Sequence, residues 1–521
     1  MFQRHFLLLQ RRPSRTGKLA RISPCFAVLS VFLLPALLPA ADIAAEPMID
    51  YTHDRVQTTL APGLKRIGTI KPRGAREVGR SGLAIGCEML DRDYGDFEQF
   101  KAYIEPLGIK RVRLQAGWAK TEKVQGVYDF AWLDRIVDYL VAQGLDVLME
   151  TSYGNPIYPG GGGAALSDGL PTGEVGLTAW DAWIDALAGH YKDRVKDWST
   201  WNEPSNAKGN SPEILADNNI RTAEIIKRHI PDARIAGLVL SSPNVRFAEP
   251  YMKILSEKGK AGLFHWIIYH DYSLNPDAVY PKVEEFAKMV HRYAPEVKIW
   301  QGEAGATSDR HYSAKISSAE WNSELTQCKW NARHMIGDLG HGIDSLVFTF
   351  YDPAYDHPER YTKFVDPLWI RTRTDRFMKR MGLVKCNEDG RMLKVKPAYY
   401  TVQNVASVFD SSLEPVMGFT CDVQCAKQTA TYLFAKKPGG RHVLAFWDSS
   451  SHPENENPTT PAQITFTGVA FEEPVWVDMV TGAIYELPAD RVVAEGDKTV
   501  LKDIPVYDAP ALITDKSVVV Y

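Results

Sequence analysis

Two glutamates in this sequence have neighbours and spacing that suit paired-carboxyl chemistry. Glu203 stands between Asn202 and Pro204 at the end of one apolar run, and Glu303 closes another run 100 residues later. Cleavage of a glycosidic bond needs one neutral carboxyl to protonate the leaving oxygen and one ionised carboxylate to attack or to activate water. If the two carboxyls stand ~5–5.5 Å apart, the ionised one attacks directly and the sugar keeps its anomeric configuration.

The elements that must position these glutamates follow a regular alternation of short apolar runs and amphipathic helical stretches. The expected strands are Leu83–Met89, Arg111–Gln115, Asp146–Thr151, Asp197–Trp201, Arg234–Leu238, His265–His270, Lys298–Glu303 and Asp344–Phe350. The expected helices are Asp96–Leu107, Ala131–Gln143, Ala179–Lys192, Pro212–His229, Pro250–Lys258, Tyr280–Tyr293, Trp321–Leu339 and Ala398–Phe409. Eight such units predict a closed (β/α)8 TIM barrel rather than an open sheet. The fourth and seventh strands lie on opposite sides of that ring, so Glu203 and Glu303 converge across its mouth.

The domain boundaries follow from changes in this pattern. Residues 1–41 carry six Lys and Arg and no acid, followed by a short apolar run interrupted by prolines, which is the layout of a secretory signal peptide. Residues 42–80 form an N-terminal extension, and 81–410 form the barrel. Beyond it the period changes from helical to two, and turn residues separate paired runs, so 411–521 are expected to form an antiparallel β-sandwich.

Composition excludes several classes of function. The chain has 521 residues, with 60 Lys and Arg against 64 Asp and Glu; loss of the leader leaves 54 against 64, a net charge of −10. This balance gives no reason to expect a nucleic-acid partner, or a membrane partner after signal cleavage. The six cysteines show no metal-ligand spacing, and we expect neither a metal nor an organic cofactor. Whether Cys421 and Cys425 are bonded, and the oligomeric state, stay open at this point.

The Asn202-Glu203-Pro204 triplet with Glu303 resembles the signature of the clan A retaining glycoside hydrolases. Within that clan, three further stretches resemble family 39, which includes β-xylosidases, iduronidases and exopolysaccharide hydrolases. They are Val127–Val137, His270–Tyr272 and Lys396–Tyr400. The resemblance implies that Glu203 is the acid/base and Glu303 the nucleophile. It covers most of 81–410 and implies a retaining, double-displacement reaction on an oligo- or polysaccharide.

Four polar residues near the strand ends are expected to assist these glutamates. Arg113 faces the same mouth, and the clan's pattern implies that it hydrogen-bonds the nucleophile and keeps it ionised; the alternative is a surface ion pair. Asn202 is placed to bind the sugar 2-hydroxyl, or else to form a turn before Pro204. Tyr272 and His270 resemble the clan's partners of the nucleophile, although His270 also fits a core histidine.

Aromatic and basic residues near the mouth suggest how a sugar would be held. Sugar rings stack on aromatic faces, and the candidate platforms are Trp118, Tyr153, Trp300, Phe350, Tyr351 and Trp369. A basic cluster in the segment after the eighth strand would favour an acidic sugar if it faced the cleft; a solvated helix face is the alternative. Its members are Arg371, Arg373, Arg376, Lys379 and Arg380.

The sequence therefore predicts a secreted or periplasmic retaining glycosidase. Two alternatives stay open. One is another clan A activity on the same glutamates, such as a β-galactosidase-like or endo-glycanase specificity. The other is a carbohydrate-binding barrel without catalysis, which the second carboxyl argues against, because a binding module gains nothing from desolvating it.

Overall fold

The computed structural model describes residues 55–166, 168–207, 209–309, 322–355 and 377–519. A compact unit extends from Pro47 to Tyr521 and contains every described residue. The expected signal peptide, 1–41, lies outside the described residues.

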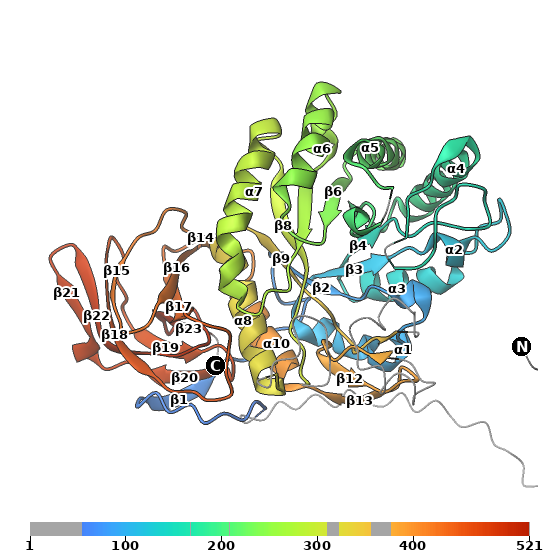
Figure 1. Cartoon of the computed structure of the whole chain (residues 1–521). Coiled ribbons are helices and arrows are strands. Elements are labelled where there is room, and N and C mark those ends of the chain that lie inside the picture. The colour runs from blue at the N-terminus through green and yellow to red at the C-terminus, as the bar shows by residue number, and fades with distance from the viewer. Residues whose placement is uncertain (1–54, 167, 208, 310–321, 356–376, 520–521) are drawn as a thin grey trace, which may run out of the picture. The chain divides into compact units, whose positions relative to one another are not determined.

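Eight parallel strands close into a barrel, which confirms the predicted fold (Figure 1). The ring closes where the first strand pairs in parallel with the last, with Leu83 opposite Ser345. In chain order the strands are β2 (Leu83–Gly86), β3 (Arg111–Gln115), β4 (Asp146–Glu150), β5 (Asp197–Ser199), β6 (Arg234–Leu240), β7 (Trp266–His270), β8 (Lys298–Ala304) and β9 (Asp344–Val347).

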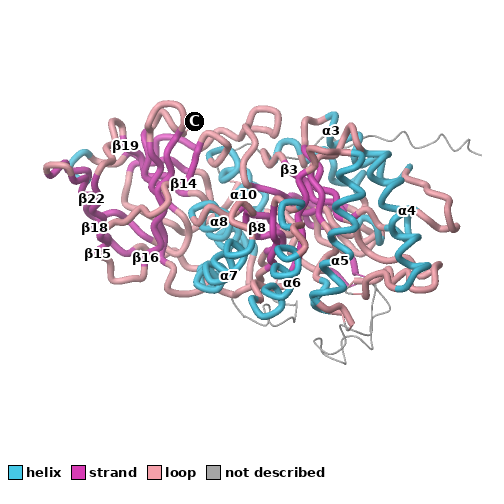
Figure 2. Tube along the Cα trace, turned by 90° about the horizontal axis from the view of Figure 1, so that it is seen from above, coloured by secondary structure: helices cyan, strands magenta, loops and turns pink. Residues whose placement is uncertain are grey.

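Amphipathic helices surround these strands, and Figure 2 shows several of them outside the barrel strands. They are α3 (Ala131–Ala142), α4 (Gly173–Tyr191), α5 (Pro212–His229), α6 (Val245–Glu257), α7 (Tyr280–Tyr293), α8 (Glu324–Gly340) and α10 (Pro397–Val408). Between β9 and α10 the chain forms two short antiparallel pairs. These are β10 (Ala354–Tyr355) with β11 (Phe377–Met378), and β12 (Val384–Cys386) with β13 (Met392–Val395).

Three helix predictions need correction. The helix expected over Ala179–Lys192 begins six residues earlier, as α4 (Gly173–Tyr191). The helix expected over Asp96–Leu107 is only one turn, α1 (Phe97–Phe100), followed by two short 3₁₀ segments. Pro106 lacks the N–H that would continue a helix here and disfavours helical backbone at the preceding residue. The helix expected to begin at Pro250 begins at Val245 instead, because the Asn244 side chain caps it by accepting from Phe247 N at 3.2 Å.

Strand β3 has an unusual distribution of polarity for a buried strand. Arg111, Arg113 and Gln115 alternate with Val112 and Leu114, and all five residues are buried. Because side chains alternate across a strand, the three polar residues share one face and the two apolar residues the other. Arg113 projects to the mouth described below, so the polar face of β3 is the one inside the barrel.

The C-terminal residues form two antiparallel sheets, as predicted. The larger has the order β1-β20-β19-β23-β17-β16-β14 and the smaller the order β15-β18-β22-β21. Their strands are β14 (Leu413–Pro415), β15 (Asp422–Gln424), β16 (Thr429–Lys436), β17 (His442–Asp448), β18 (Thr460–Thr467), β19 (Pro474–Asp478), β20 (Ala483–Glu486), β21 (Val492–Glu495), β22 (Lys498–Val506) and β23 (Ala511–Asp515). The Trp476 indole of one sheet donates to the Pro505 carbonyl of the other at 3.3 Å, so their faces are in contact.

Part of the expected N-terminal extension belongs to the larger sheet. β1 (Lys65–Thr69) pairs antiparallel with β20, from Lys65 opposite Glu486 to Thr69 opposite Ala483. The segment 42–80 therefore contributes an edge strand to a sheet built from the opposite end of the chain.

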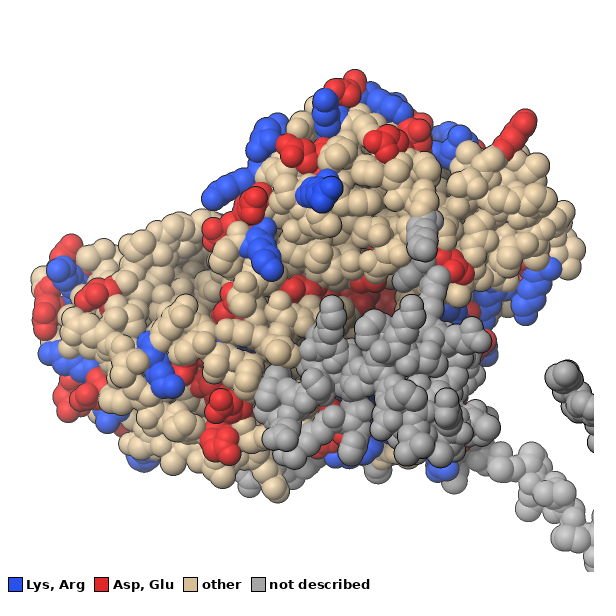
Figure 3. Space-filling view, in the orientation of Figure 1, with Lys and Arg blue, Asp and Glu red and all other residues tan. Residues whose placement is uncertain are grey.

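The cysteines and the surface complete this description. Cys421 and Cys425 are both free thiols, and Cys421 Sγ donates to the Thr431 hydroxyl at 3.3 Å. Within the described ranges, no helix combines the length and apolar character needed to span a bilayer. Basic and acidic side chains are interspersed over the face drawn in Figure 3.

Candidate active site

The two predicted glutamates meet at the carboxyl ends of opposite barrel strands. Glu303 lies within β8, and Glu203 follows β5 with φ 45° and ψ 48°, a left-handed conformation that non-glycine residues seldom adopt. Such strained backbone persists where the surrounding structure imposes it, and it occurs often at functional sites. Here it starts a 3₁₀ turn, Pro204–Asn206, whose Asn206 amide donates to Glu203 Oε2 at 2.7 Å.

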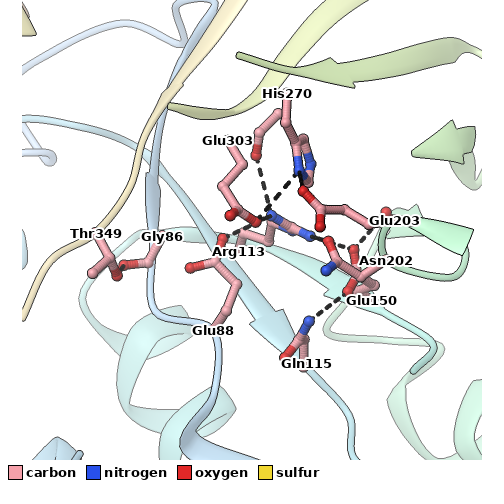
Figure 4. A network of polar contacts seen from close by, with 12 residues as sticks. Gly86, Glu88, Arg113, Gln115, Glu150, Asn202, Glu203, His270, Glu303 and Thr349 are labelled. Atoms are coloured by element: carbon pink, nitrogen blue, oxygen red, sulfur yellow. Dashed lines mark hydrogen bonds and ion pairs between the residues drawn. The ribbon is translucent and has the colours of Figure 1, made fainter. Parts of the chain in front are cut away.

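A histidine joins the two carboxyl groups (Figure 4). His270, at the end of β7, is fully buried, and its Nδ1 lies 2.8 Å from Glu203 Oε1 and 3.6 Å from Glu303 Oε2. One oxygen of each glutamate and this nitrogen all lie within 4.8 Å of one another. The separation of the carboxyls therefore suits direct attack by one of them, and it is shorter than the ~6.5–9.5 Å that inverting enzymes use to hold a water between the two.

The surroundings of Glu303 favour its ionised form. Tyr272 donates to Oε1 at 2.5 Å, and Arg113 Nη1 donates to Oε2 at 3.1 Å. Burial opposes ionisation, but His270, Arg113, Lys379 and the Tyr272 hydroxyl outweigh it and lower the pKa of Glu303 to about 2. The pKa of Tyr272 is raised well above its usual value, by burial and then by Glu303, so this phenol stays a donor.

The same three residues have the donor types of a metal site, and their charge environment decides against that use. Glu203, His270 and Glu303 offer two oxygens and one nitrogen at close range. However, the Arg113 guanidinium already lies 3.1 Å from Glu303 Oε2, and Lys379 also acts on this carboxylate. A divalent cation would have to enter beside these positive charges, so the arrangement fits an acid and a nucleophile better than a metal ligand set.

Arg113 is the centre of a larger polar network (Figure 4). Its Nη1 donates to Glu88, to the Gly302 carbonyl and to Glu303, at 2.9, 3.1 and 3.1 Å. Its Nη2 donates to Glu150 at 2.6 Å and to the Asn202 side chain at 2.7 Å. The structure thus places Arg113 beside Glu303, as predicted, and buries it rather than leaving it in a surface ion pair.

Glu88 and Glu150 are two members of this network that were not singled out from the sequence. Glu88 follows β2 and Glu150 ends β4, so both stand at the carboxyl ends of predicted strands, as Glu203 and Glu303 do. The strand-end criterion that selected the two candidate catalytic residues would therefore have found these two as well.

Asn202 is held by the same network. Its side-chain oxygen accepts from Arg113, and its amide donates to the Tyr153 hydroxyl at 2.8 Å. One amide N–H is left for another partner, so binding of a sugar hydroxyl stays a prediction. Tyr153, proposed as a stacking platform, is 1% exposed and serves here through its hydroxyl.

Two further predicted platforms, Trp118 and Tyr351, lie in the core, which corrects the expectation for them. Trp118 is fully buried, stacks on Trp183 at 5.6 Å and donates to Glu122 at 2.5 Å. Tyr351 is fully buried, stacks on Phe100 at 4.8 Å and donates to the Glu88 carbonyl at 2.5 Å. Because other rings cover their faces, neither presents a surface to a sugar.

The remaining candidates divide between the core and the undescribed part of the chain. Trp300 and Phe350 are fully buried, while Trp369, Arg371, Arg373 and Arg376 lie outside the described residues. Arg380 donates to the Cys386 carbonyl at 2.8 Å, a structural contact. Lys379 is half-buried, with Nζ 4.7 Å from the Phe348 ring centre and 5.4 Å from that of Tyr272, and so lies beside the site.

Comparisons with known proteins agree with this architecture. A family model described as beta-galactosidase, of glycoside hydrolase family 42, matches residues 96–182. No curated protein sequence matches the chain.

Three solved structures show the similarity of fold. A family 39 glycoside hydrolase from Bacteroides cellulosilyticus WH2 superposes with a TM-score of 0.54 at 14% identity, covering 84% of this chain and 81% of that one. A monomeric beta-xylosidase from Caulobacter crescentus CB15 gives 0.52 at 16% identity, covering 86% and 97%. The family 39 enzyme from Xanthomonas axonopodis pv. citri gives 0.52 at 15% identity, covering 86% and 95%. The chain shares the barrel fold of these enzymes, and the expected resemblance is confirmed at the level of fold.

Proposed function

We propose that this protein is a retaining glycoside hydrolase with Glu203 as acid/base and Glu303 as nucleophile. The observation that carries the proposal is the close approach of the two carboxyls at the barrel mouth, with Glu303 held ionised. A pair that brings two partly buried carboxyls together and keeps one charged is costly to build for binding alone.

The proposed reaction has two steps. In the first, Glu203 gives its proton to the glycosidic oxygen, the bond from that oxygen to C1 breaks, and a Glu303 oxygen bonds to C1. In the second, Glu203 takes a proton from water, the water oxygen bonds to C1, and the bond to Glu303 breaks. Tyr272 and Arg113, which hold the two oxygens of Glu303, release the carboxylate in the first step and receive it again in the second.

The substrate is proposed to be an oligo- or polysaccharide. The family 42 match favours galactosides and the family 39 resemblance favours xylosides, so both belong in the first panel of aryl glycosides. The family 42 match ends before Glu203 and contains neither glutamate, so it favours a substrate to test rather than a site. From the basic leader and apolar run of 1–41, we also propose that the protein is secreted or periplasmic.

Labelling of the nucleophile tests the mechanism. A 2-deoxy-2-fluoro glycoside matched to the best substrate should inactivate the enzyme. Its electron-poor sugar slows hydrolysis of the covalent intermediate, which therefore accumulates. Peptide mapping should place the label on Glu303, and the Glu303→Gln variant should take none. Labelling elsewhere, or an inverted product anomer by NMR, would contradict the assignment.

The acid/base role has a separate test. Glu203→Ala should lose ~10²–10⁴ in rate on poor leaving groups and keep the first step on leaving groups that need no proton. Added azide should then give a glycosyl azide of retained configuration. Equal loss of rate on good and poor leaving groups, without an azide product, would remove Glu203 from this role. If the wild type turns over no glycoside and takes no label, a non-catalytic barrel is favoured.

A further inference from the structure

Three carboxyl groups share the Arg113 guanidinium, and the proposed reaction uses only one of them. Glu88, Glu150 and Glu303 accept from Arg113 at 2.9, 2.6 and 3.1 Å. Three negative charges around one buried positive charge would leave a large uncompensated charge in a medium of low polarity. A proton on one of the three carboxyls would reduce this charge.

The hydrogen-bond donors around each group separate them. Glu150 accepts from Arg113, from the Gln115 amide at 2.8 Å, and from the hydroxyls of Ser152 and Ser199 at 2.8 and 3.3 Å. Glu303 accepts from Arg113 and Tyr272 and lies close to His270. Both groups are surrounded by donors, which is the environment of an ionised carboxylate.

Glu88 has much poorer solvation. The side chain is buried, and within the described part of the chain Oε1 accepts from Arg113 alone while Oε2 is a buried atom without a side-chain or main-chain hydrogen-bond partner. Leaving a buried oxygen unpaired costs more when the group is charged than when it is neutral. The carboxyl lies against Gly86, where an added Cβ would stand 2.2 Å from Oε2, so the backbone of β2 closes that side.

Among the residues that the structure describes, no second cation lies within hydrogen-bonding distance of the Glu88 carboxyl. Burial raises its pKa most; Arg113 and the main-chain N–H of Glu88 lower it, whereas Glu303 and Glu150 raise it from β8 and β4. Cys87, the preceding residue, is a buried thiol whose pKa burial raises well above its usual value, so it stays neutral. The Tyr351 hydroxyl donates to the main-chain carbonyl of Glu88, not to its side chain.

We propose that Glu88 is a positioning residue that carries a proton in the folded chain and binds Arg113 as a neutral acceptor. A neutral Glu88 holds the Arg113 guanidinium in place without neutralising it, so the positive charge stabilises the Glu150 and Glu303 carboxylates. Glu88 acts on the reaction through Arg113 and does not touch the substrate. Burial, the dominant effect, raises the pKa of Glu88 to about 8, in agreement with the donor arrangement.

A comparison of melting temperatures against pH tests the protonation directly. Glu88→Gln keeps the shape and hydrogen-bonding pattern of a protonated glutamic acid. The pKa of Glu88 is 4.5 in the unfolded chain and about 8 in the folded chain. Rising pH between these values therefore destabilises the wild type but not the variant. The unfolding constant of the wild type relative to the variant should grow by up to about tenfold per pH unit between these values and level off above pH 8.

The matched control is Glu150→Gln, which makes the same chemical change beside the same guanidinium. It should lower the melting temperature at pH 7, because Arg113 Nη2 and the serine hydroxyls lose an ionised acceptor, whereas Glu88→Gln should raise it. A difference between wild type and Glu88→Gln that stays constant from pH 5 to 8, or an equal loss in the two variants, would overturn the proposal. This readout does not depend on finding a substrate.

The positioning role rests on the proposed function and has its own readout. Glu88→Leu leaves Arg113 Nη1 without one of its acceptors and should lower kcat by at least ~10-fold, with a smaller effect on KM. Glu88→Gln should restore most of the activity that leucine removes. If both variants lose kcat while the stability depends on pH as expected, Glu88 is protonated but the positioning role is overturned. If the wild type has no glycosidase activity at all, the proposed function is overturned instead.

Discussion

Two arginines on one strand organise opposite ends of the barrel in opposite ways. Arg113, near the carboxyl end of β3, is one cation among three carboxyl groups. Arg111, at the amino end, belongs to a group of three arginines that share the Asp197 carboxylate, while Asp146 and Asp344 pair with Arg80 and Arg111 at 3.2 and 3.6 Å. Arg111 Nε, Arg80 Nη2 and Arg234 Nε lie 3.2, 2.7 and 2.7 Å from the oxygens of Asp197.

The difference separates a cation shared by three carboxyl groups from a carboxylate shared by three cations. Arginine does not lose its proton in proteins, so the three guanidiniums that share Asp197 keep their charge. The rings of Trp266 and Trp300, with centres 5.3 and 4.7 Å from the Arg111 guanidinium, help to accommodate it. An excess of carboxyl groups can instead take up protons, and this is the end where proton transfer is proposed.

Removal of the Arg113 charge at the barrel mouth should have the largest effect on kcat/KM. Arg113→Met leaves Glu88, Glu150 and Glu303 without their shared partner, so the nucleophile loses a charge that keeps it ionised. We expect kcat/KM to fall about 10³-fold or more, with a loss of stability of about 3–5 kcal/mol. Steady-state kinetics and urea unfolding measure the two effects, and near-normal activity would show that the Arg113 charge is not needed.

Removal of the anion at the amino end should cost stability alone. Asp197→Asn leaves three guanidiniums without their common carboxylate, which is 1% exposed, and should destabilise the fold by about 3–5 kcal/mol. The kcat/KM measured below the melting temperature should stay within about threefold of wild type, since Asp197 lies at the other end of the strands. A large loss of kcat/KM in a folded variant would mean that the two ends are coupled.

The pH dependence of stability should distinguish two carboxyls on the same guanidinium. The folded pKa of Glu303 is about 2, below its unfolded value of 4.5, so its contribution is present above pH 4.5 and lost as the pH falls toward 2. Relative to Glu303→Gln, the wild type should gain about 3 kcal/mol as the pH rises through this window. Glu88 should show the opposite slope at higher pH. Urea unfolding of both variants between pH 3 and 9 checks this, and slopes of the same sign would contradict the assignment of charges.

The sequence located the reactive pair because the position of a side chain at a strand end depends only on the order of the elements. Glu203, Glu303, Arg113, His270 and Tyr272 all meet at the mouth, as strand order and the clan resemblance predicted. Glu88 and Glu150 satisfied the same criterion, but their importance depends on how far side chains reach across the barrel. A linear pattern does not contain that information.

The aromatic residues show the opposite limitation. Trp118 and Tyr351 follow strand ends, yet Trp183 and Phe100 cover their rings. Whether an aromatic face is open to a sugar depends on tertiary packing by residues distant in the chain, so proximity to a strand end was a poor guide.

The pairing of β1 with β20 sets an order for assembly. The two strands are more than 400 residues apart, from Lys65 to Glu486, and the whole barrel is encoded between them. During synthesis β1 must wait for the last part of the chain, and closing so large a loop carries an entropy cost that grows only slowly with its length. Until β1 arrives, β20 is an exposed sheet edge, and such edges recruit strands from other chains. Aggregation during production should therefore rise when β1 is deleted, even though this strand contributes no side chain to the site.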